Sequence, residues 1–280
     1  MDKHLYRTMT HEDVNEAVLQ GRVVLIPVGQ LETHGVHLPI DVDVVQVQYV
    51  VDEAAARAPD VLVAAPPIYY GFSEHVMDFP GTMNIRPEIM IEYLFDICRS
   101  FARQGFDRIV LVNGHGSNRP ICEIVTRRVT NETTAMCATL GHFSLAREVL
   151  QEIRESPYGG TAHACEAETS EYLFLRPDLV KMDKIADEWA PDYRPWRSDD
   201  FTEDAGPVHF MEFWSQRSRS GTEGAPTLAT AEKGRKLTEA SIEKLIEFGR
   251  WWQAIEFPER VDLKVQRPPR SAQSVVETHQ

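Results

Sequence analysis

The segment LETHGVHLPIDVD (31–43) brings together five side chains that can bind a metal ion, namely Glu32, His34, His37, Asp41 and Asp43. A glycine and a proline interrupt the segment, so a continuous helix is not expected. If residues 31–35 are extended, Glu32 and His34 project to the same side, because side chains alternate along a strand. With Asp43 returning after the proline turn, the segment supplies nitrogen and oxygen ligands suited to zinc, manganese or iron. The alternative is a solvated polar loop.

A histidine in a second segment also directly follows a predicted strand. His115 directly follows the apolar run RIVLVNG (108–114) and lies between two glycines in LVNGHGSN. Glycines in this position let the backbone pass close to a neighbouring group. Taken alone, His115 could be a turn residue. Together with the first segment, we expect it to be a fourth metal ligand, because ligands collect at the carboxyl ends of parallel strands.

Two further segments carry candidate catalytic side chains. HACEAETSEYLF (163–174) is a predicted helix start that contains His163 and Glu168, where the helix dipole favours carboxylates and a substrate anion alike. YYGFSEHVMDFPGT (69–82) places His75 among aromatic residues. His75 either faces the site or is a structural histidine.

Apolar runs typical of strands buried on both faces alternate with helical patterns along the chain. The runs cover 22–29, 61–68, 108–114 and 133–140, and the helical stretches cover 44–58, 86–105 and 119–130. Another helix is expected to start at Thr10, and a long final helix covers 231–255. This order predicts an α/β fold with a mostly parallel sheet, helices on both faces and ligands at the carboxyl ends of the strands.

We expect residues 1–255 to form a single α/β domain and residues 256–280 to form a C-terminal tail. The segment 186–227 lacks clear periodicity and contains three tryptophans. Structureless loops of this length are uncommon in compact domains unless they line a site or an interface, and tryptophans oppose disorder. An ordered excursion is therefore predicted there.

The chain carries 43 acidic and 29 basic residues, which gives a formal net charge of −14. That balance argues against a nucleic-acid or anionic-membrane surface, because either partner needs a basic patch. No apolar run approaches the roughly 20 residues of a membrane span. Four widely spaced cysteines without a CxxC pair indicate reduced thiols. We expect a cytoplasmic protein that acts on a small polar molecule.

Five motifs between residues 27 and 234 resemble, in the same order, those of the creatininase family of metal-dependent hydrolases. They are PVGQLETHGVHLPIDVD, GFSEHVMDFPGT, VNGHGSN, HACEAETS and GTEGAPTLATAEKG. The resemblance implies a three-layer α/β/α sandwich and a homo-oligomer, often a hexamer. It also implies a centre of one or two zinc, manganese or iron ions.

Carried over position by position, the resemblance implies four metal ligands, namely Glu32, His34, Asp43 and His115. Asp43 would be the bridge where two ions bind. Glu168 would lie at or next to the metals and is a further candidate ligand. His163 matches the proton-transfer group of the family, with His75 and Glu168 as reserves.

One position departs from the family pattern. Creatinine-hydrolysing members have a glutamate two positions after the histidine of the NGH motif, and this chain has Ser117 there. The surroundings of GFSEH differ as well. The resemblance therefore makes creatinine an unlikely substrate and implies a weaker or differently completed second metal site. The candidate substrate-binding residues are His75, Ser117 and Asn118.

A bound divalent ion lowers the pKa of water to about 7 and polarises a carbonyl oxygen. The expected reaction is hydrolysis of a small polar substrate, most readily at the C–N bond of a cyclic or N-acyl amide. One alternative is a ring-opening C–C hydrolase of a cyclic diketone such as an oxidised inositol. Another is a noncatalytic oligomeric protein with a structural metal. An aromatic slot from Trp189, Trp196 or Trp214 would favour a planar heterocycle, and hydroxyl-binding groups such as Asn118 would favour a polyol.

Overall fold

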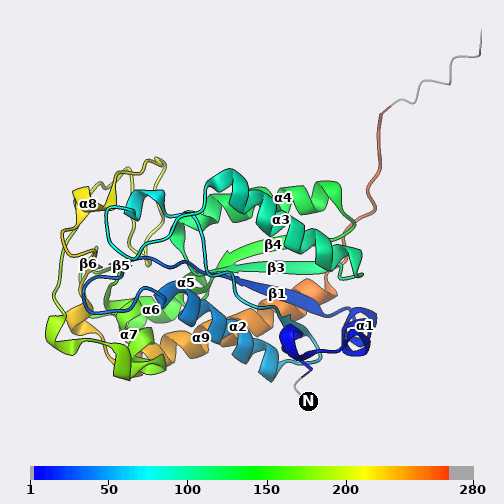
Figure 1. Cartoon of the computed structure of the whole chain (residues 1–280), viewed down its shortest axis with the longest axis horizontal. Helices are drawn as coiled ribbons and strands as arrows, with labels where there is room; N and C mark the ends of the chain where they lie inside the picture. Colours follow the sequence, from blue (N-terminus) through cyan, green and yellow to red (C-terminus); the bar gives the residue numbers. More distant parts are fainter. Residues whose placement is uncertain (1–2, 265–280) are drawn as a thin grey trace, which may run out of the picture.

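The computed structural model describes residues 3–264, and within them the main sheet has four parallel strands in the order β2-β1-β3-β4. Figure 1 labels β1, β3 and β4 of this sheet. The strands are β1 (Val23–Val28), β2 (Leu62–Ala64), β3 (Arg108–Asn113) and β4 (Met136–Gly141). β3 pairs with β1 through Val24 and Ile109, and with β4 through Ile109 and Cys137. The runs 22–29, 61–68 and 108–114 each contain one of these strands, and the run 133–140 covers all of β4 except Gly141.

The two central strands explain the continuous apolar runs. All residues of β1 are buried, and five of the six residues of β3 are buried, because helices cover both faces of the sheet. β2 is shorter than its apolar run, since Pro66 and Pro67 follow it and a proline has no N–H to donate to the ladder. The chain then meets β1 once more through a bridge between Val28 and Ile68.

Nine α-helices fall within the described range 3–264. They are α1 (His11–Leu19), α2 (Val42–Arg57), α3 (Pro87–Arg103), α4 (Arg119–Glu132), α5 (His142–Leu145), α6 (Arg147–Ile153), α7 (Glu166–Leu175), α8 (Trp214–Arg217) and α9 (Ala231–Ala254). Short 3-10 turns cover Tyr6–Thr8, Glu74–Val76, Gly116–Asn118, Pro177–Leu179, Met182–Lys184 and Pro226–Leu228. Thr10 caps α1 in a capping box with Asp13, as its sequence predicts.

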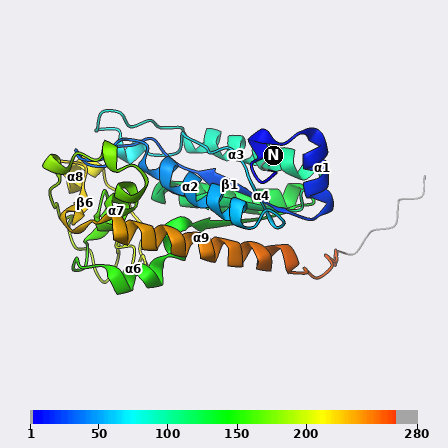
Figure 2. The ribbon, with the colours of Figure 1, turned by 90° about the horizontal axis from the view of Figure 1, so that it is seen from below.

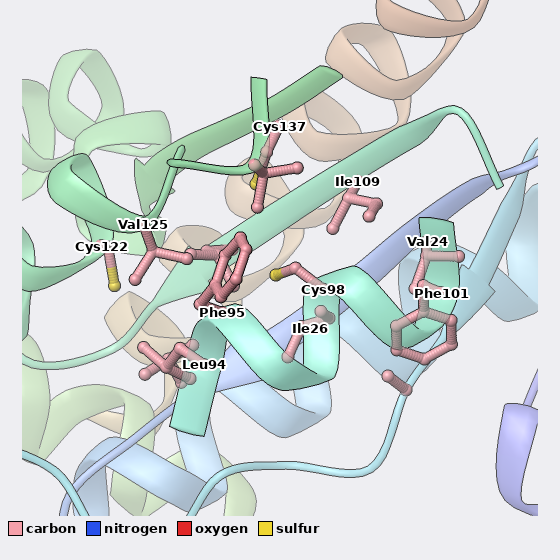
Figure 3. Packing of buried hydrophobic residues seen from close by; sticks show 14 of the residues in the cluster. Val24, Ile26, Leu94, Phe95, Cys98, Phe101, Ile109, Cys122, Val125 and Cys137 are labelled. Atoms are coloured by element: carbon pink, nitrogen blue, oxygen red, sulfur yellow. The ribbon is translucent and has the colours of Figure 1, made fainter. Parts of the chain in front are cut away.

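The helices form one layer on each side of the sheet (Figure 2). α1, α3 and α4 bury their apolar faces against one side, where Phe95 and Cys98 pack near Ile26 and Ile109 (Figure 3). α2 and α9 cover the other side, where Val47 of α2 packs in the same cluster as strand residues. The predicted three-layer α/β/α sandwich is confirmed. All four cysteines are buried and free.

A second, smaller sheet extends the molecule beyond the carboxyl ends of the main strands (Figure 1). It consists of β5 (Thr161–His163) and β6 (Glu223–Gly224), paired antiparallel. The excursion 186–227 carries α8 and β6, joins β5 through the pairing of Gly224 with Thr161, and is closed on itself by the bridge between Glu188 and Gly224. The excursion therefore lies beside the ends of the strands, where a site is expected.

The C-terminal tail was predicted to begin at residue 256. Residues 256–264 follow α9 without helix or strand, and residues 265–280 lie outside the described residues. Among the helices of residues 3–264, none is both long and apolar enough to cross a membrane.

Candidate metal centre

A cluster of ionisable side chains from separate segments lies at the carboxyl ends of β1 and β3. Its members are Glu32 and His34 after β1, Asp43 in the first turn of α2, His115 after β3, His163 at the end of β5 and Glu168 in the first turn of α7. Each is buried, with at most 8% of its surface exposed. The structure thus brings together all five residues predicted as ligands and the predicted proton-transfer histidine.

Close packing of α2 against the strand ends brings Asp43 into the cluster. A Cβ on Gly29 would lie 2.7 Å from Cγ2 of Val44, and a Cβ on Gly114 would lie 2.6 Å from the carbonyl oxygen of Asp43. Glycine at both positions permits this approach. The first turn of α2 therefore sits directly over the ends of β1 and β3.

The first set of ligand atoms, which we call site A, belongs to Glu32, Asp43 and His115. Nδ1 of His115 lies 3.3 Å from Oε1 of Glu32 and 3.2 Å from Oδ2 of Asp43. The three ligand atoms lie within 4.8 Å of one another. Two carboxylates and one imidazole suit zinc, manganese or iron.

The second set, site B, belongs to His34, Asp43 and Glu168. Nε2 of His34 lies 3.1 Å from Oδ1 of Asp43 and 3.8 Å from Oε1 of Glu168. Asp43 therefore directs one carboxylate oxygen to each site. Each site has three protein ligands, one fewer than a closed structural zinc site.

Backbone carbonyls fix the tautomers of both ligand histidines. Nε2 of His115 lies 3.2 Å from the carbonyl oxygen of Phe72, and Nδ1 of His34 lies 3.3 Å from that of Glu32. A carbonyl oxygen can only accept, so these ring nitrogens carry the proton. When the ring is neutral, its opposite nitrogen presents a lone pair to the cluster, which is the orientation that metal-binding histidines adopt.

Several ligand atoms have no hydrogen bond within the described part of the chain. They are Nε2 of His34, Oδ2 of Asp43 and Oε2 of Glu168. Leaving buried polar atoms without a partner costs free energy. A divalent cation in each of sites A and B would satisfy these atoms, so the residues present fit metal ions.

The metal-free cluster has strongly perturbed protonation. Burial raises the pKa of Glu32, but the neighbouring His115 outweighs burial and holds the pKa at about 2. Burial lowers the pKa of His115, while the carboxylates of Glu32 and Asp43 raise it to about 10. Burial likewise opposes the raised pKa of His34, which Asp43 and Glu168 hold well above its usual value. A metal ion would replace these protons, since ligand imidazoles must be neutral.

His163 differs from His34 and His115 because its pKa is lowered, whereas theirs are raised. Burial, followed by the nearby His34, lowers its pKa. Its Nε2 lies 2.7 Å from the carbonyl oxygen of Thr33 and so carries the proton, while Nδ1 lies 3.7 Å from Oε1 of Glu32. A neutral imidazole with its free lone pair toward the cluster can take up a proton. His163 also forms a third candidate set of metal ligands together with Glu32 and His34.

The predicted substrate-binding residues occupy different positions. His75 is half-buried, and its Nε2 lies 3.4 Å from Oγ of Ser117. Burial lowers the pKa of His75 to about 4. Asn118 is fully buried, donates from Nδ2 to the carbonyl of Gly29 at 3.0 Å and accepts from the N–H of Phe72 at 2.9 Å. Its amide therefore holds two loops together, whereas His75 and Ser117 lie beside the cluster.

Two contacts of the cluster were not predicted as site residues from sequence. Ser73, which is buried in the GFSEH motif, donates its hydroxyl to Oε2 of Glu32. Trp214 packs edge-on against His163 and His75, with ring centroids 4.9 and 5.8 Å away. The motif position gave a signal for Ser73, but Trp214 lies in the aperiodic excursion, where only packing reveals its place.

A three-layer α/β sandwich with buried carboxylates and imidazoles at its strand ends defines a protein of the metal-dependent hydrolase class. The chain belongs to the creatininase family, because the family model for creatinine amidohydrolase matches residues 7–248. The chain is accordingly a hydrolase of that family, which excludes the alternative of a noncatalytic protein.

Relatives within the family differ in the reactions for which they are named. The 3-dehydro-scyllo-inosose hydrolase of Thermotoga maritima is 28% identical over 258 residues, covering 86% of this chain and 80% of that protein. A mycofactocin precursor peptide peptidase of Mycobacterium ulcerans is 30% identical over 247 residues, covering 81% and 85%. The creatinine amidohydrolase of Pseudomonas putida is 27% identical over 240 residues, covering 80% and 87%.

Solved creatininase structures share the fold. A creatininase variant described as Zn-Zn type superposes with a TM-score of 0.74 at 25% identity, covering 88% of this chain and 97% of that chain. A structure described as creatininase Mn gives a TM-score of 0.75 at 25% identity, covering 89% and 98%.

Proposed function

We propose that the protein hydrolyses the C–N bond of a small cyclic or N-acyl amide with the help of two divalent metal ions. The observation that carries the proposal is the position of Asp43, whose two carboxylate oxygens face separate ligand sets. Creatininases described with zinc or manganese have the same fold, which supports either metal. Glu32 and His115 would complete site A, and His34 and Glu168 would complete site B.

A bound divalent ion supplies two kinds of chemistry, a more acidic water and a polarised carbonyl. The chain's own residues supply the remaining functions. His163 is held by the carbonyl of Thr33 with Nδ1 free, so it can take a proton at Nδ1 and return it to the leaving atom. Trp214 packs edge-on against the ring of His163, which is buried.

A second candidate is the ring-opening hydrolysis of a C–C bond in an oxidised cyclitol. The named activity of the Thermotoga maritima relative favours it. Ser117 favours it as well, since creatinine-hydrolysing members are expected to have a glutamate there. Of the three tryptophans considered for an aromatic slot, Trp214 packs on the cluster, while Trp189 and Trp196 are 47% and 62% exposed. One tryptophan ring beside the cluster does not form the aromatic slot that would favour a planar heterocycle as the substrate.

The expectations of a hexamer and of a cytoplasmic location follow from the family resemblance and the composition, and they stay proposals. A homo-oligomer would be checked by light scattering of the purified chain.

The test combines metal analysis with a substrate panel. Purified protein should hold close to two ions per chain, lose turnover on chelation and regain it on addition of zinc or manganese. Cyclic amides, N-acyl amides and oxidised cyclitols should be compared, because C–N cleavage creates a new amino group, on the ring-opened product or as a free amine, and C–C cleavage does not. Full turnover in protein without detectable metal would contradict the proposal.

A further inference from the structure

Two potential ligands of the first segment, His37 and Asp41, belong to neither metal site. Both side chains instead reach α7, the helix that carries Glu168. Nε2 of His37 lies 2.9 Å from Oγ1 of Thr169, and the hydroxyl of Tyr172 donates to Oδ1 of Asp41 at 2.7 Å. The segment that supplies ligands to the cluster therefore also contacts the helix behind site B.

The hydrogen bond between His37 and Thr169 has a defined direction. The hydroxyl of Thr169 donates its one proton to the carbonyl oxygen of Ala164 at 3.3 Å, so it can only accept from His37. Burial lowers the pKa of His37 to about 4, so the ring is neutral near pH 7 and its single proton lies on Nε2. The hydrogen bonds therefore run in one direction, from His37 through Thr169 to the carbonyl oxygen of Ala164.

This series of hydrogen bonds ends at Ala164, a residue with a strained backbone conformation. Ala164 has a φ of +49°, a left-handed conformation that is strained for a residue other than glycine. It lies between His163 and the start of α7, so its conformation sets the angle between the proton-transfer histidine and the helix of Glu168. Strain of this kind persists only where the surroundings hold it.

A third contact reaches the same helix from α2. The amide of Gln46, one turn after Asp43, donates to the backbone carbonyl of Glu168 at 2.8 Å. Segment 37–46 is therefore joined to α7 at Glu168, Thr169 and Tyr172. All of these side chains except Asp41 are buried.

These contacts bear on site B and not on site A. Site B needs Glu168 from α7 next to Asp43 from α2, whereas the ligands of site A come from strand ends and α2. A small displacement of α7 would open site B and leave site A intact, because site geometry tolerates only about 0.5 Å of error.

We propose that His37 and Thr169 are positioning residues that place Glu168 and so set the metal affinity of site B. The inference rests on the proposed two-metal function. Groups that orient metal ligands from behind typically change metal affinity or activity by roughly 10- to 100-fold when they are removed. His37 does not contact the metal in this arrangement and acts through Thr169 and Ala164.

The test is a titration of metal-free protein with zinc and, separately, manganese, followed by calorimetry. His37→Ala should weaken one of the two binding events by roughly 10- to 100-fold and leave the other unchanged. Thr169→Val, which removes the hydroxyl at nearly constant volume, should have the same effect. The double variant should lose no more than either single one, because both changes break the same series of hydrogen bonds.

Conservative variants separate positioning from a general loss of structure. His37→Gln retains an N–H donor at a similar reach and Thr169→Ser retains the hydroxyl, so both should recover most of the affinity. Glu168→Gln marks the complete loss of site B, and His11→Ala at the exposed start of α1 is the matched control. Thermal unfolding of each metal-free variant reports on the fold itself.

Unchanged affinity for both ions in His37→Ala and Thr169→Val would overturn the inference, and so would equal weakening of both ions. Absence of metal binding in the unmodified protein would instead overturn the proposed function.

Discussion

The two candidate metal sites of this protein share Asp43 but are held by different parts of the molecule. Site A lies where β1 and β3 end, under the first turn of α2, and these elements pack in the middle of the main sheet. Site B depends in addition on α7, which lies beyond the main sheet next to β5 and α9 (Figure 1). A difference in metal affinity between the sites is therefore expected from architecture alone.

α7 is fixed by polar contacts as much as by apolar packing. Lys233 of α9 forms a buried ion pair with Glu166 at 2.6 Å, and Ser170 accepts the N–H of Thr230 at 3.1 Å. Gly234 lets α9 approach the backbone of Ser170 closely, where a Cβ would collide. Because directional contacts fail abruptly when geometry shifts, site B should be the more easily disturbed site.

The largest effect is expected from the residue that belongs to both sites. Asp43→Asn replaces an oxygen ligand by an amide nitrogen and removes the charge between the two ions, so both sites should lose metal. Elemental analysis should find almost no metal, and turnover should fall by more than the roughly 10²- to 10⁴-fold expected for an acid–base group. Retention of either ion at full affinity would mean that Asp43 is not shared.

A smaller effect is expected at the proton-transfer position. His163→Gln can keep an N–H toward the carbonyl of Thr33 but has no counterpart of Nδ1, so metal content should stay near that of the unmodified protein. Turnover should fall roughly 10²- to 10⁴-fold. An unchanged rate would remove His163 from the mechanism, and loss of one ion would make it a ligand of the third set.

The smallest effect concerns stability and arises outside both sites. Burial lowers the pKa of His75 to about 4, so between about pH 6.5 and 4 the unfolded chain takes up a proton that the folded chain excludes. This contribution to stability is complete above pH 6.5 and is lost as the pH falls toward 4. Urea unfolding of metal-free His75→Gln should therefore show a shallower decline over that range. An identical decline in both proteins would show that His75 titrates normally in the folded state.

The sequence predicted the frame well because the relevant signals are local. Continuous apolar runs marked β1 and β3, and the capping box of Thr10 marked the start of α1. The predicted end of a strand was less accurate where prolines interrupt its pairing with the neighbouring strand. The run 61–68 gave a strand only at Leu62–Ala64, because two prolines end its ladder.

The candidate site was predicted in part. The ligand types and their place after strands pointed to Glu32, His34, Asp43 and His115, the predicted helix start pointed to His163 and Glu168, and family resemblance gave each of them a role. The hydrogen bond from Ser73 to Glu32 and the packing of Trp214 on His163 were not predicted, since each contact joins segments that are distant in the sequence. The boundaries of the domain at residues 1–255 stay a prediction.

The sequence alone determined the order of strands and helices and the supply of carboxylates and imidazoles at the strand ends, because side-chain periodicity and residue type are properties of short segments. Only the tertiary structure showed that His37, three residues from the candidate ligand His34, contacts Thr169 of α7. Only the tertiary structure showed how the two carboxylate oxygens of Asp43 are directed toward separate sets of side chains. Both outcomes depend on contacts between residues that are far apart in the sequence, and such contacts are set by how the layers pack.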